Sequence, residues 1–364
     1  MRISDLDTPA LLIDLDVMER NLRRVAEYAA AHGLRLRPHT KTHKIPALGR
    51  RQLELGAAGL TVAKVGEAEV MLGAGPGDLL LAYPVVGARK LERLGQIARK
   101  LRLTVALDSL DVARPLSEVA ASQGVEIGVL AEADVGLGRV GVAPDEDLVE
   151  LARHLQRLPG LVFEGVAFYP GHIKRLDEDG RRAWARLRET LAGMLASLRR
   201  AGISPRIVSG GSTPTLFESH TLAGLNEIRP GTYIFNDRNT VLSGACSWED
   251  CAATVLTTVV STARPGQIII DGGSKTFSSD RVVHAGEDGF GRILEAPEAV
   301  FWNMNEEHGY INVTACRQDF RVGDRLRVIP NHVCVAVNLH ERVYGVRGDL
   351  VEEIWTVEGR GKLQ

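Results

Sequence analysis

Short runs of apolar and β-branched residues alternate with longer helical patterns through the first two-thirds of the chain. In the helical segments, such as 17–32 and 181–201, apolar residues recur at the spacing of one helix face. About eight strand–helix units predict a (β/α)₈ barrel, although a doubly wound sheet would give a similar rhythm with fewer strands. The expected strands are 35–41, 60–63, 78–83, 103–108, 126–134, 162–169, 206–210 and 227–230.

The rhythm changes after about residue 243, where strand patterns follow one another and no long helical pattern intervenes. This predicts a second, all-β domain of the barrel or sandwich kind. A strand at 10–14 has no place in the barrel count and is expected to join this β domain. The predicted domains are therefore 15–243, and 1–14 with 244–364. The expected β-domain strands are 251–263, 267–271, 310–315, 325–329, 333–339, 342–346 and 351–357.

Composition excludes several classes of protein. A chain of 364 residues exceeds what one hydrophobic core usually supports. Lys plus Arg (44) nearly balance Asp plus Glu (46), which argues against a basic nucleic-acid surface, and 45% hydrophobic residues argue against extended disorder. Apolar runs such as 79–86 are too short to span a bilayer, and the first residues lack the apolar core of a secretory signal. With four cysteines, a cytoplasmic protein without nucleic-acid or membrane partners is expected.

In a (β/α)₈ barrel the active site lies at the carboxyl ends of the strands. The ends predicted here are rich in Lys, Arg, His, Tyr and Gly. That mixture suits a bound anion and a polarised ring better than a purely apolar ligand. These ends are 37–44, 134–141, 168–172, 209–215 and 229–233.

The segment 210–215 has the features of a phosphate-binding loop. A Gly-Gly pair allows close approach of backbone N–H groups, Ser212 and Thr213 add hydroxyl donors, and Pro214 suits the first position of a helix. A plain loop with an N-cap residue is the alternative. No Lys follows the glycines at the spacing of a Walker loop. A similar segment at 271–275 lies between predicted β strands and is expected to be a turn.

Lys41 is the leading candidate for a nucleophilic amine. At the inner end of a barrel strand it would be partly desolvated, with Arg37, Lys44, His39 and His43 nearby in sequence. Desolvation and the nearby positive charges would both lower the pKa of Lys41 and favour an amine that forms a Schiff base. A basic surface loop is the alternative, and Lys44 competes for the same role.

His332 and Cys334 form a candidate metal pair. On the predicted strand 333–339 and its flank, residues at positions i and i+2 would point to one face. Imidazole plus thiolate suits Zn²⁺, and two protein ligands leave positions open for water or substrate. A buried cysteine beside a loop histidine is the alternative. The other three cysteines are expected to be core thiols.

Seven motifs, spread over essentially the whole chain, resemble those of one enzyme family. The chain is similar to the D-threonine aldolase and D-serine dehydratase family, pyridoxal-phosphate enzymes of the alanine racemase fold type. The order of these motifs is specific to the family as a class, and less specific for the reaction. The motifs are TPALLIDLD at 8–16, RPHTKTHK at 37–44, VGEAE at 65–69, DVGLGR at 134–139, GGSTP at 210–214, RPGTY at 229–233 and PNHVC at 330–334.

The resemblance implies a (β/α)₈ barrel with a β domain, a homodimer, a D-amino-acid substrate and two cofactors. These are pyridoxal 5′-phosphate and a divalent metal, either zinc or manganese or magnesium. The matched positions are Lys41 for the cofactor lysine, Arg139 and Tyr169 beside the cofactor ring, Gly211, Ser212 and Thr213 for the phosphate, Gly231 and Tyr233 nearby, and His332 and Cys334 for the metal.

Two reactions stay open within this family. Its aldolases typically carry His-x-Asp at the metal and its D-serine dehydratases His-x-Cys, so Cys334 favours dehydration, whereas 337–341 looks more like the aldolases. Retro-aldol cleavage of a β-hydroxy D-amino acid to glycine and an aldehyde is the preferred expectation, with β-elimination as the alternative. A racemase would need two bases and no metal, so His332 and Cys334 argue against it. A non-catalytic pyridoxal-phosphate carrier would lack residues 244–364, and a sugar-phosphate barrel enzyme would not need Lys41.

Overall fold

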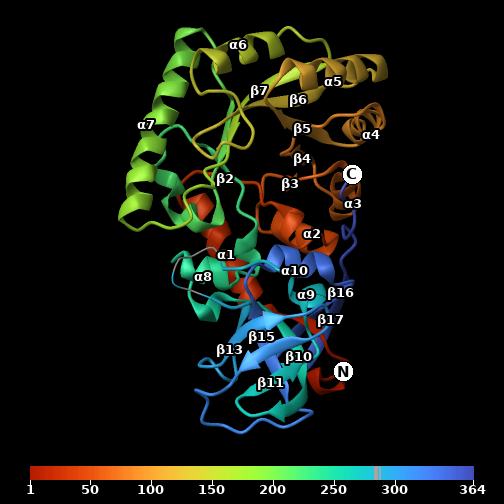
Figure 1. The fold of residues 1–364 in the computed structure, drawn as a ribbon. Helices are drawn as coiled ribbons and strands as arrows, with labels where there is room; N and C mark the ends of the chain where they lie inside the picture. Colours follow the sequence, from red (N-terminus) through yellow and green to blue (C-terminus); the bar gives the residue numbers. More distant parts are fainter. Residues whose placement is uncertain (283–285, 287) are drawn as a thin grey trace. The chain divides into compact units, whose positions relative to one another are not determined.

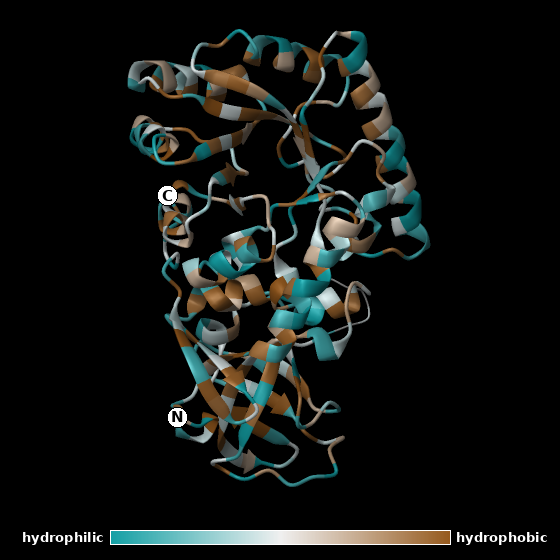
Figure 2. Ribbon diagram, turned by 180° about the vertical axis from the view of Figure 1, so that it is seen from behind, coloured by the Kyte–Doolittle hydropathy of each residue, from teal (hydrophilic) through white to brown (hydrophobic). Residues whose placement is uncertain are grey.

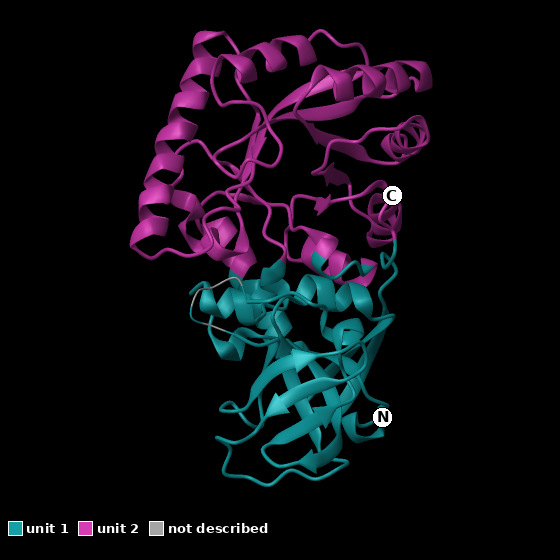
Figure 3. Cartoon of the chain, viewed as in Figure 1, with its two compact units in different colours: residues 1–24, 42–45, 232–361 teal, residues 25–41, 46–231, 362–364 magenta. Residues whose placement is uncertain are grey.

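The computed structural model describes residues 1–282, 286 and 288–364 (Figure 1). The chain divides into two compact units, coloured separately in Figure 3. The barrel unit comprises residues 25–41, 46–231 and 362–364. The sheet unit comprises residues 1–24, 42–45 and 232–361.

The barrel unit contains a curled sheet of eight parallel strands in the order β2-β9-β8-β7-β6-β5-β4-β3. An isolated parallel bridge between His39 and Thr61 joins the segment that follows β2 to β3. The strands are almost wholly buried, as the helix-covered strands of a parallel barrel require. Their bounds are β2 Arg35–Leu36, β3 Leu60–Val62, β4 Asp78–Leu81, β5 Arg102–Leu107, β6 Ile127–Ala133, β7 Leu161–Phe168, β8 Ile207–Gly210 and β9 Glu227–Ile228.

Helices connect these strands, and the longer ones bury an apolar stripe. Helix α7 buries Trp184, Leu187, Leu191, Met194 and Leu198 at helical spacing, and brown and teal residues alternate along it in Figure 2. The connecting helices are α2 Pro46–Glu54, α3 Val65–Met71, α4 Ala88–Ala98, α5 Leu110–Gln123, α6 Glu146–Leu155, α7 Glu178–Arg200 and the 3₁₀ segment η4 Thr213–Thr221, while α1 Leu15–Ala31 spans the boundary between the units.

The sheet unit is built on a mixed sheet of nine strands. Strand β1 (Ala10–Asp14) pairs antiparallel with β10 and parallel with β16, so the N-terminal strand joins this sheet as expected. The (β/α)₈ barrel with a separate β domain is thereby confirmed. The other strands are β10 Ala253–Arg264, β11 Gln267–Ile270, β12 Gly291–Ile293, β13 Val300–Met304, β14 Gly309–Asn312, β15 Arg325–Pro330, β16 Arg342–Arg347 and β17 Leu350–Thr356.

The structure differs from the expectation at several places, among them the expected turn at 271–275, where Ser274–Phe277 forms the short helix α9. The expected strand at 333–339 is wrong, because Val333–Leu339 forms helix α10 and buries Val333, Ala336 and Val337 at helical spacing. The expected strand at 35–41 ends at Leu36, and the 3₁₀ turn η2 occupies Thr40–Thr42. Strands β12 and β13 were not expected. The short helices of the sheet unit are α8 Arg238–Leu242, α9 Ser274–Phe277, η5 Thr232–Ile234 and η6 Trp248–Asp250.

Across the part of the chain that the structure describes, every helix is too short or too polar to cross a bilayer.

Candidate active site

Lys41 lies in the η2 turn rather than on a strand. Its side chain is exposed, contrary to the expectation of a partly desolvated amine at a strand end. Its backbone N–H donates to Nδ1 of His39 at 3.4 Å. Because the strand ends at Leu36, strand alternation does not determine where Lys41 points, and the turn does so instead.

Lys44 occupies a different setting from Lys41. It has a positive φ of 57°, is buried in the sheet unit, and its amine donates to Oδ1 of Asn338 at 2.8 Å. Lys41 belongs to the barrel unit, which also holds the candidate ring and phosphate residues. The structure thus separates the two competing lysines by their environment.

A cluster of charged side chains surrounds His39 in the barrel unit. Burial lowers the pKa of His39 well below its ordinary value, and the positive charges of Lys41, Arg229 and Arg139 lower it further. Burial raises the pKa of Glu132, against the opposing pull of Arg229 and Arg139. Three cations therefore act on one neutral imidazole, an arrangement that suits an anionic ligand.

Arg139 stands on a loop that two acidic side chains hold in shape. The Asp134 carboxylate accepts hydrogen bonds from the N–H groups of three successive residues, 136–138, at 3.0–3.1 Å. Burial tends to raise the pKa of Asp134, but these three N–H groups outweigh it and the pKa lies below the ordinary value. Asp108 accepts from the N–H of Gly141 at 3.0 Å.

The structure brings Arg139 and Tyr169 together, as the resemblance implied. The guanidinium of Arg139 lies 4.8 Å from the centre of the Tyr169 ring, within the range of a cation–π contact. The nearby His172 has a buried Nδ1 atom for which the described residues provide no hydrogen-bond partner. A buried polar atom of this kind is normally satisfied, so it points to a bound group.

The segment after β8 combines a glycine turn with buried hydroxyls. Gly211 has a φ of 93°, which only glycine adopts readily. The buried Ser212 makes no capping hydrogen bond to the backbone of η4, and its hydroxyl contacts that of Thr215 at 3.1 Å. The plain N-cap alternative is therefore not what Ser212 does here. Thr213 is also buried at the start of η4.

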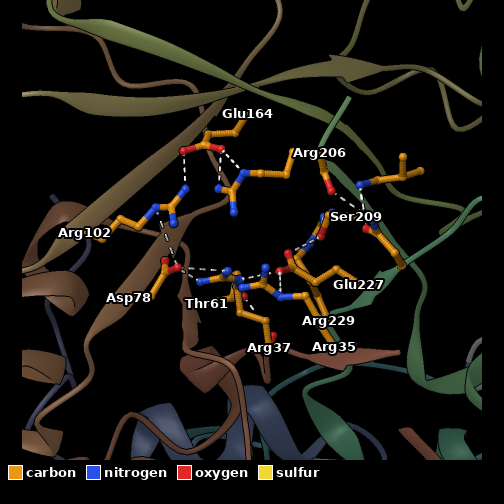
Figure 4. A network of polar contacts seen from close by, with 12 residues as sticks. Arg35, Arg37, Thr61, Asp78, Arg102, Glu164, Arg206, Ser209, Glu227 and Arg229 are labelled. Carbon is orange, nitrogen blue, oxygen red and sulfur yellow. Dashed lines mark hydrogen bonds and ion pairs between the residues drawn. The ribbon is translucent and has the colours of Figure 1, made fainter. Parts of the chain in front are cut away.

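A buried network lies in the barrel interior (Figure 4). Arg37 donates through Nε to Glu227 at 2.9 Å and through a terminal nitrogen to Asp78 at 2.7 Å. Ser209 donates to the other oxygen of Glu227 at 2.7 Å, and Arg229 donates to Ser209 at 2.6 Å. No local sequence pattern marks a role for Glu227, because its partners are distant in sequence.

His332 and Cys334 are neighbours, but not through strand alternation. The expected shared strand face is wrong: His332 is the N-cap residue of α10 and Cys334 lies in its first turn. The Cys334 thiolate raises the pKa of His332 above its ordinary value, and Asp237 adds to the rise although burial opposes it. Cys334 Sγ lies 3.2 Å from the hydroxyl of Thr42.

The pair does not by itself form a complete metal shell. Within residues 1–282, 286 and 288–364, no group of three or more His, Cys, Asp or Glu side chains is placed to hold a metal ion. Sequence reasoning missed Asp237, whose carboxylate lies 3.2 Å from the ring of His332. Gly231 follows β9 in the barrel unit, and the buried Tyr233 lies in η5 of the sheet unit.

Comparisons with known proteins place this chain in a family. Residues 13–239 match the family described as alanine racemase, N-terminal domain, and residues 252–346 match a putative serine dehydratase domain. A D-threonine aldolase from Arthrobacter sp. is 34% identical over 99% of this chain and 94% of that protein.

Two solved structures are similar over nearly their whole length. The D-threonine aldolase from Filomicrobium marinum has a TM-score of 0.94 at 33% identity, covering 100% of this chain and 98% of that one. A D-threo-3-hydroxyaspartate dehydratase from Delftia sp. HT23 has a TM-score of 0.89 at 32% identity, with 98% of each chain covered. A variant of that dehydratase was solved in the metal-free form.

Proposed function

Because this chain belongs to the alanine-racemase-fold family that contains the D-threonine aldolases, we propose that it cleaves β-hydroxy D-amino acids by a retro-aldol reaction. The products are glycine and an aldehyde. The observation that carries this proposal is the similarity to D-threonine aldolases over essentially the whole chain, through the barrel and the β domain alike.

The residues of the barrel unit fit pyridoxal 5′-phosphate. The loop at Gly211, Ser212 and Thr213 offers N–H groups and buried hydroxyls to a phosphate. The cations around His39 suit the negative charge of the same molecule. The unpartnered Nδ1 of His172 leaves one more hydrogen bond for a bound group.

Each candidate residue has a distinct task in this proposal. Lys41 binds the cofactor covalently, the 211–213 loop binds its phosphate, and Arg139 and Tyr169 orient its ring. Pyridoxal phosphate, when bound, supplies an electron sink that stabilises negative charge on the substrate α carbon. In the cleavage the β-hydroxyl loses its proton, the Cα–Cβ bond breaks, and the α carbon takes a proton to give glycine.

Lys41 also separates the two candidate reactions. An amine at Lys41 could also accept a proton from the substrate. Dehydration requires removal of the α proton, whereas retro-aldol cleavage leaves the α C–H bond intact. The same residue would therefore have an essential acid–base role in one reaction and a binding role in the other.

We propose that His332 and Cys334 hold a divalent metal. Imidazole and thiolate fit zinc, and the two side chains lie close enough to interact directly. Such an ion would supply Lewis-acid polarisation of a substrate hydroxyl.

D-Serine-type dehydration to a 2-oxo acid and ammonia is the second candidate. The observation that favours it is Cys334, which stands where the family's aldolases typically carry Asp. A racemase or a non-catalytic pyridoxal-phosphate carrier is less favoured, because neither needs the His332–Cys334 pair. We further propose a cytoplasmic homodimer with functional domains at 15–243, and at 1–14 with 244–364.

Product analysis tests the proposed function. The purified protein is incubated with D-threonine, D-phenylserine and D-serine, and glycine, pyruvate and ammonia are measured. We expect glycine from the first two substrates at a rate far above pyruvate formation from D-serine. The reverse ratio would replace the aldolase with the dehydratase.

A further inference from the structure

The carboxylate of Asp237 is buried and bonded at both oxygens. Oδ1 accepts hydrogen bonds from the N–H of Thr240 at 2.8 Å and from its hydroxyl at 2.6 Å. Oδ2 accepts from the N–H of Val333 at 3.0 Å and lies 3.2 Å from Nδ1 of His332. The Asp237 side chain is only 1% exposed, whereas that of His332 is 37% exposed.

These contacts determine which nitrogen of His332 carries a proton. An ionised carboxylate accepts hydrogen bonds and cannot donate them, so the Nδ1 that faces it must be an N–H donor. In a neutral imidazole, the remaining nitrogen Nε2 then carries the lone pair. The ring therefore presents Nε2 as its free ligand atom.

The same carboxylate also fixes the backbone that carries Cys334. Val333 N–H, bound to Oδ2, belongs to the first turn of α10, in which Cys334 is the next residue. Asn331, which precedes His332, is held as well, since it accepts hydrogen bonds from the backbone of Asn239 and the side chain of Arg238. The segment from α8 thus sets the position of both candidate donors.

We propose that Asp237 is a positioning residue of the metal centre, which orients His332 so that Nε2 is the ligand atom and places Cys334 beside it. This inference rests on the proposed metal site of His332 and Cys334. Mutation of a carboxylate that hydrogen-bonds to a ligating histidine typically lowers metal affinity about 10- to 100-fold.

The test measures the zinc affinity of the full-length protein by competition with a chromophoric chelator, after removal of bound metal. Asp237→Asn cannot satisfy all four donors: if its oxygen faces Thr240, its amide N–H₂ faces His332 and favours the wrong tautomer. We expect its zinc affinity to fall about 10-fold or more. Thr240→Val is the matched control, because it removes a hydrogen bond to Oδ1 without touching Oδ2; its zinc affinity should stay within about 2-fold of the parent.

A second pair of variants distinguishes failure of this inference from misfolding and from failure of the proposed metal site. If Asp237 acts mainly through His332, Asp237→Asn should lower zinc affinity much more in the parent than in a His332→Asn background, where only its contact with the backbone beside Cys334 remains. An equal loss in both backgrounds would overturn the positioning role. Unchanged affinity in His332→Asn alone would instead refute the proposed metal site. The visible spectrum of the Co²⁺-loaded Asp237→Asn protein should change as well, and a spectrum identical to the parent's would count against the inference.

Discussion

The guanidinium of Arg229 donates a hydrogen bond to the hydroxyl of Ser209 at 2.6 Å, and that hydroxyl donates to Glu227 at 2.7 Å. Glu227 also accepts from Arg37, so one buried carboxylate connects the interior of the barrel to Arg229, one of the cations that act on His39 (Figure 4). Burial lowers the pKa of Arg229, and the negative charges of Glu132 and Glu227 oppose that effect. The environment of the Arg229 charge therefore depends on the buried Ser209–Glu227–Arg37 network.

Glu227→Gln should destabilise the protein strongly, because it removes one of the two carboxylates that pair with the buried Arg37. Removing one member of a buried ion pair typically costs about 3–5 kcal/mol. Urea denaturation of parent and variant would measure the loss. As a control, Glu178→Gln breaks an exposed pair with Arg182 and should change the unfolding free energy little. Equal effects of the two variants would contradict a structural role for this network.

Lys41→Ala should remove the visible absorbance of the lysine-bound cofactor, because Lys41 is the residue proposed to bind it covalently. Lys44→Ala should keep that absorbance, since the Lys44 amine is bonded to Asn338. Spectra of both purified variants, recorded after incubation with pyridoxal phosphate, check this. A Lys41→Ala protein that keeps the band, together with a Lys44→Ala protein that loses it, would reverse the assignment.

Ser212→Ala and Thr213→Val should weaken the binding of pyridoxal phosphate. A hydrogen bond to a charged group contributes about 1.5–3 kcal/mol, so each variant should lose about tenfold or more in affinity. Titration of the apoprotein, followed by absorbance, gives the dissociation constants. Ser274→Ala, at the other Gly-Gly segment, is the control and should bind like the parent. If Ser274→Ala alone weakens binding, the phosphate site has been placed in the wrong loop.

The alternating pattern was sufficient to predict the architecture but not every local structure. Strands such as β6 and β7 were found because buried parallel strands are continuous apolar runs. The segment 333–339 also has β-branched residues, and this hid the helical spacing of Val333, Ala336 and Val337. For Lys41, the short strand β2 made alternation a poor guide.

The candidate site was predictable where a motif carries the chemistry, and less so where distant residues meet. Lys41, Ser212 and His332 stand in recognisable local patterns. Asp237 lies 95 residues from His332 in sequence, and their contact depends on how α8 and α10 pack. Glu227 and Arg37 likewise meet across neighbouring strands. Such tertiary pairs leave no spacing that one sequence could reveal.

His39→Asn should reduce the acid sensitivity of the fold. Burial and nearby cations hold the pKa of His39 well below 6.5 in the folded state. Below about pH 6.5, His39 therefore binds a proton in the unfolded state but stays neutral in the folded state. The unfolding free energy of the parent should therefore fall as the pH drops below about 6.5, by up to about 1.4 kcal/mol per pH unit from this residue. Denaturation at about pH 7.5 and about pH 5.5 measures the difference. An identical pH dependence in both proteins would exclude His39 as its source.

Chelation should abolish turnover while leaving the absorbance of the lysine-bound cofactor intact. His332 and Cys334 belong to the sheet unit and Lys41 to the barrel unit, and Lys41 needs no metal to bind the cofactor. His332 and Cys334 offer only two donors, so positions on the ion remain for water and then for the substrate hydroxyl. Activity with D-threonine, measured after chelator treatment and again after adding zinc or manganese, should be lost and then restored. Cys334→Ala should behave like the chelated parent and should not recover with added metal. Full activity in the chelated parent would show that the reaction needs no metal and that the His332–Cys334 pair has no catalytic importance.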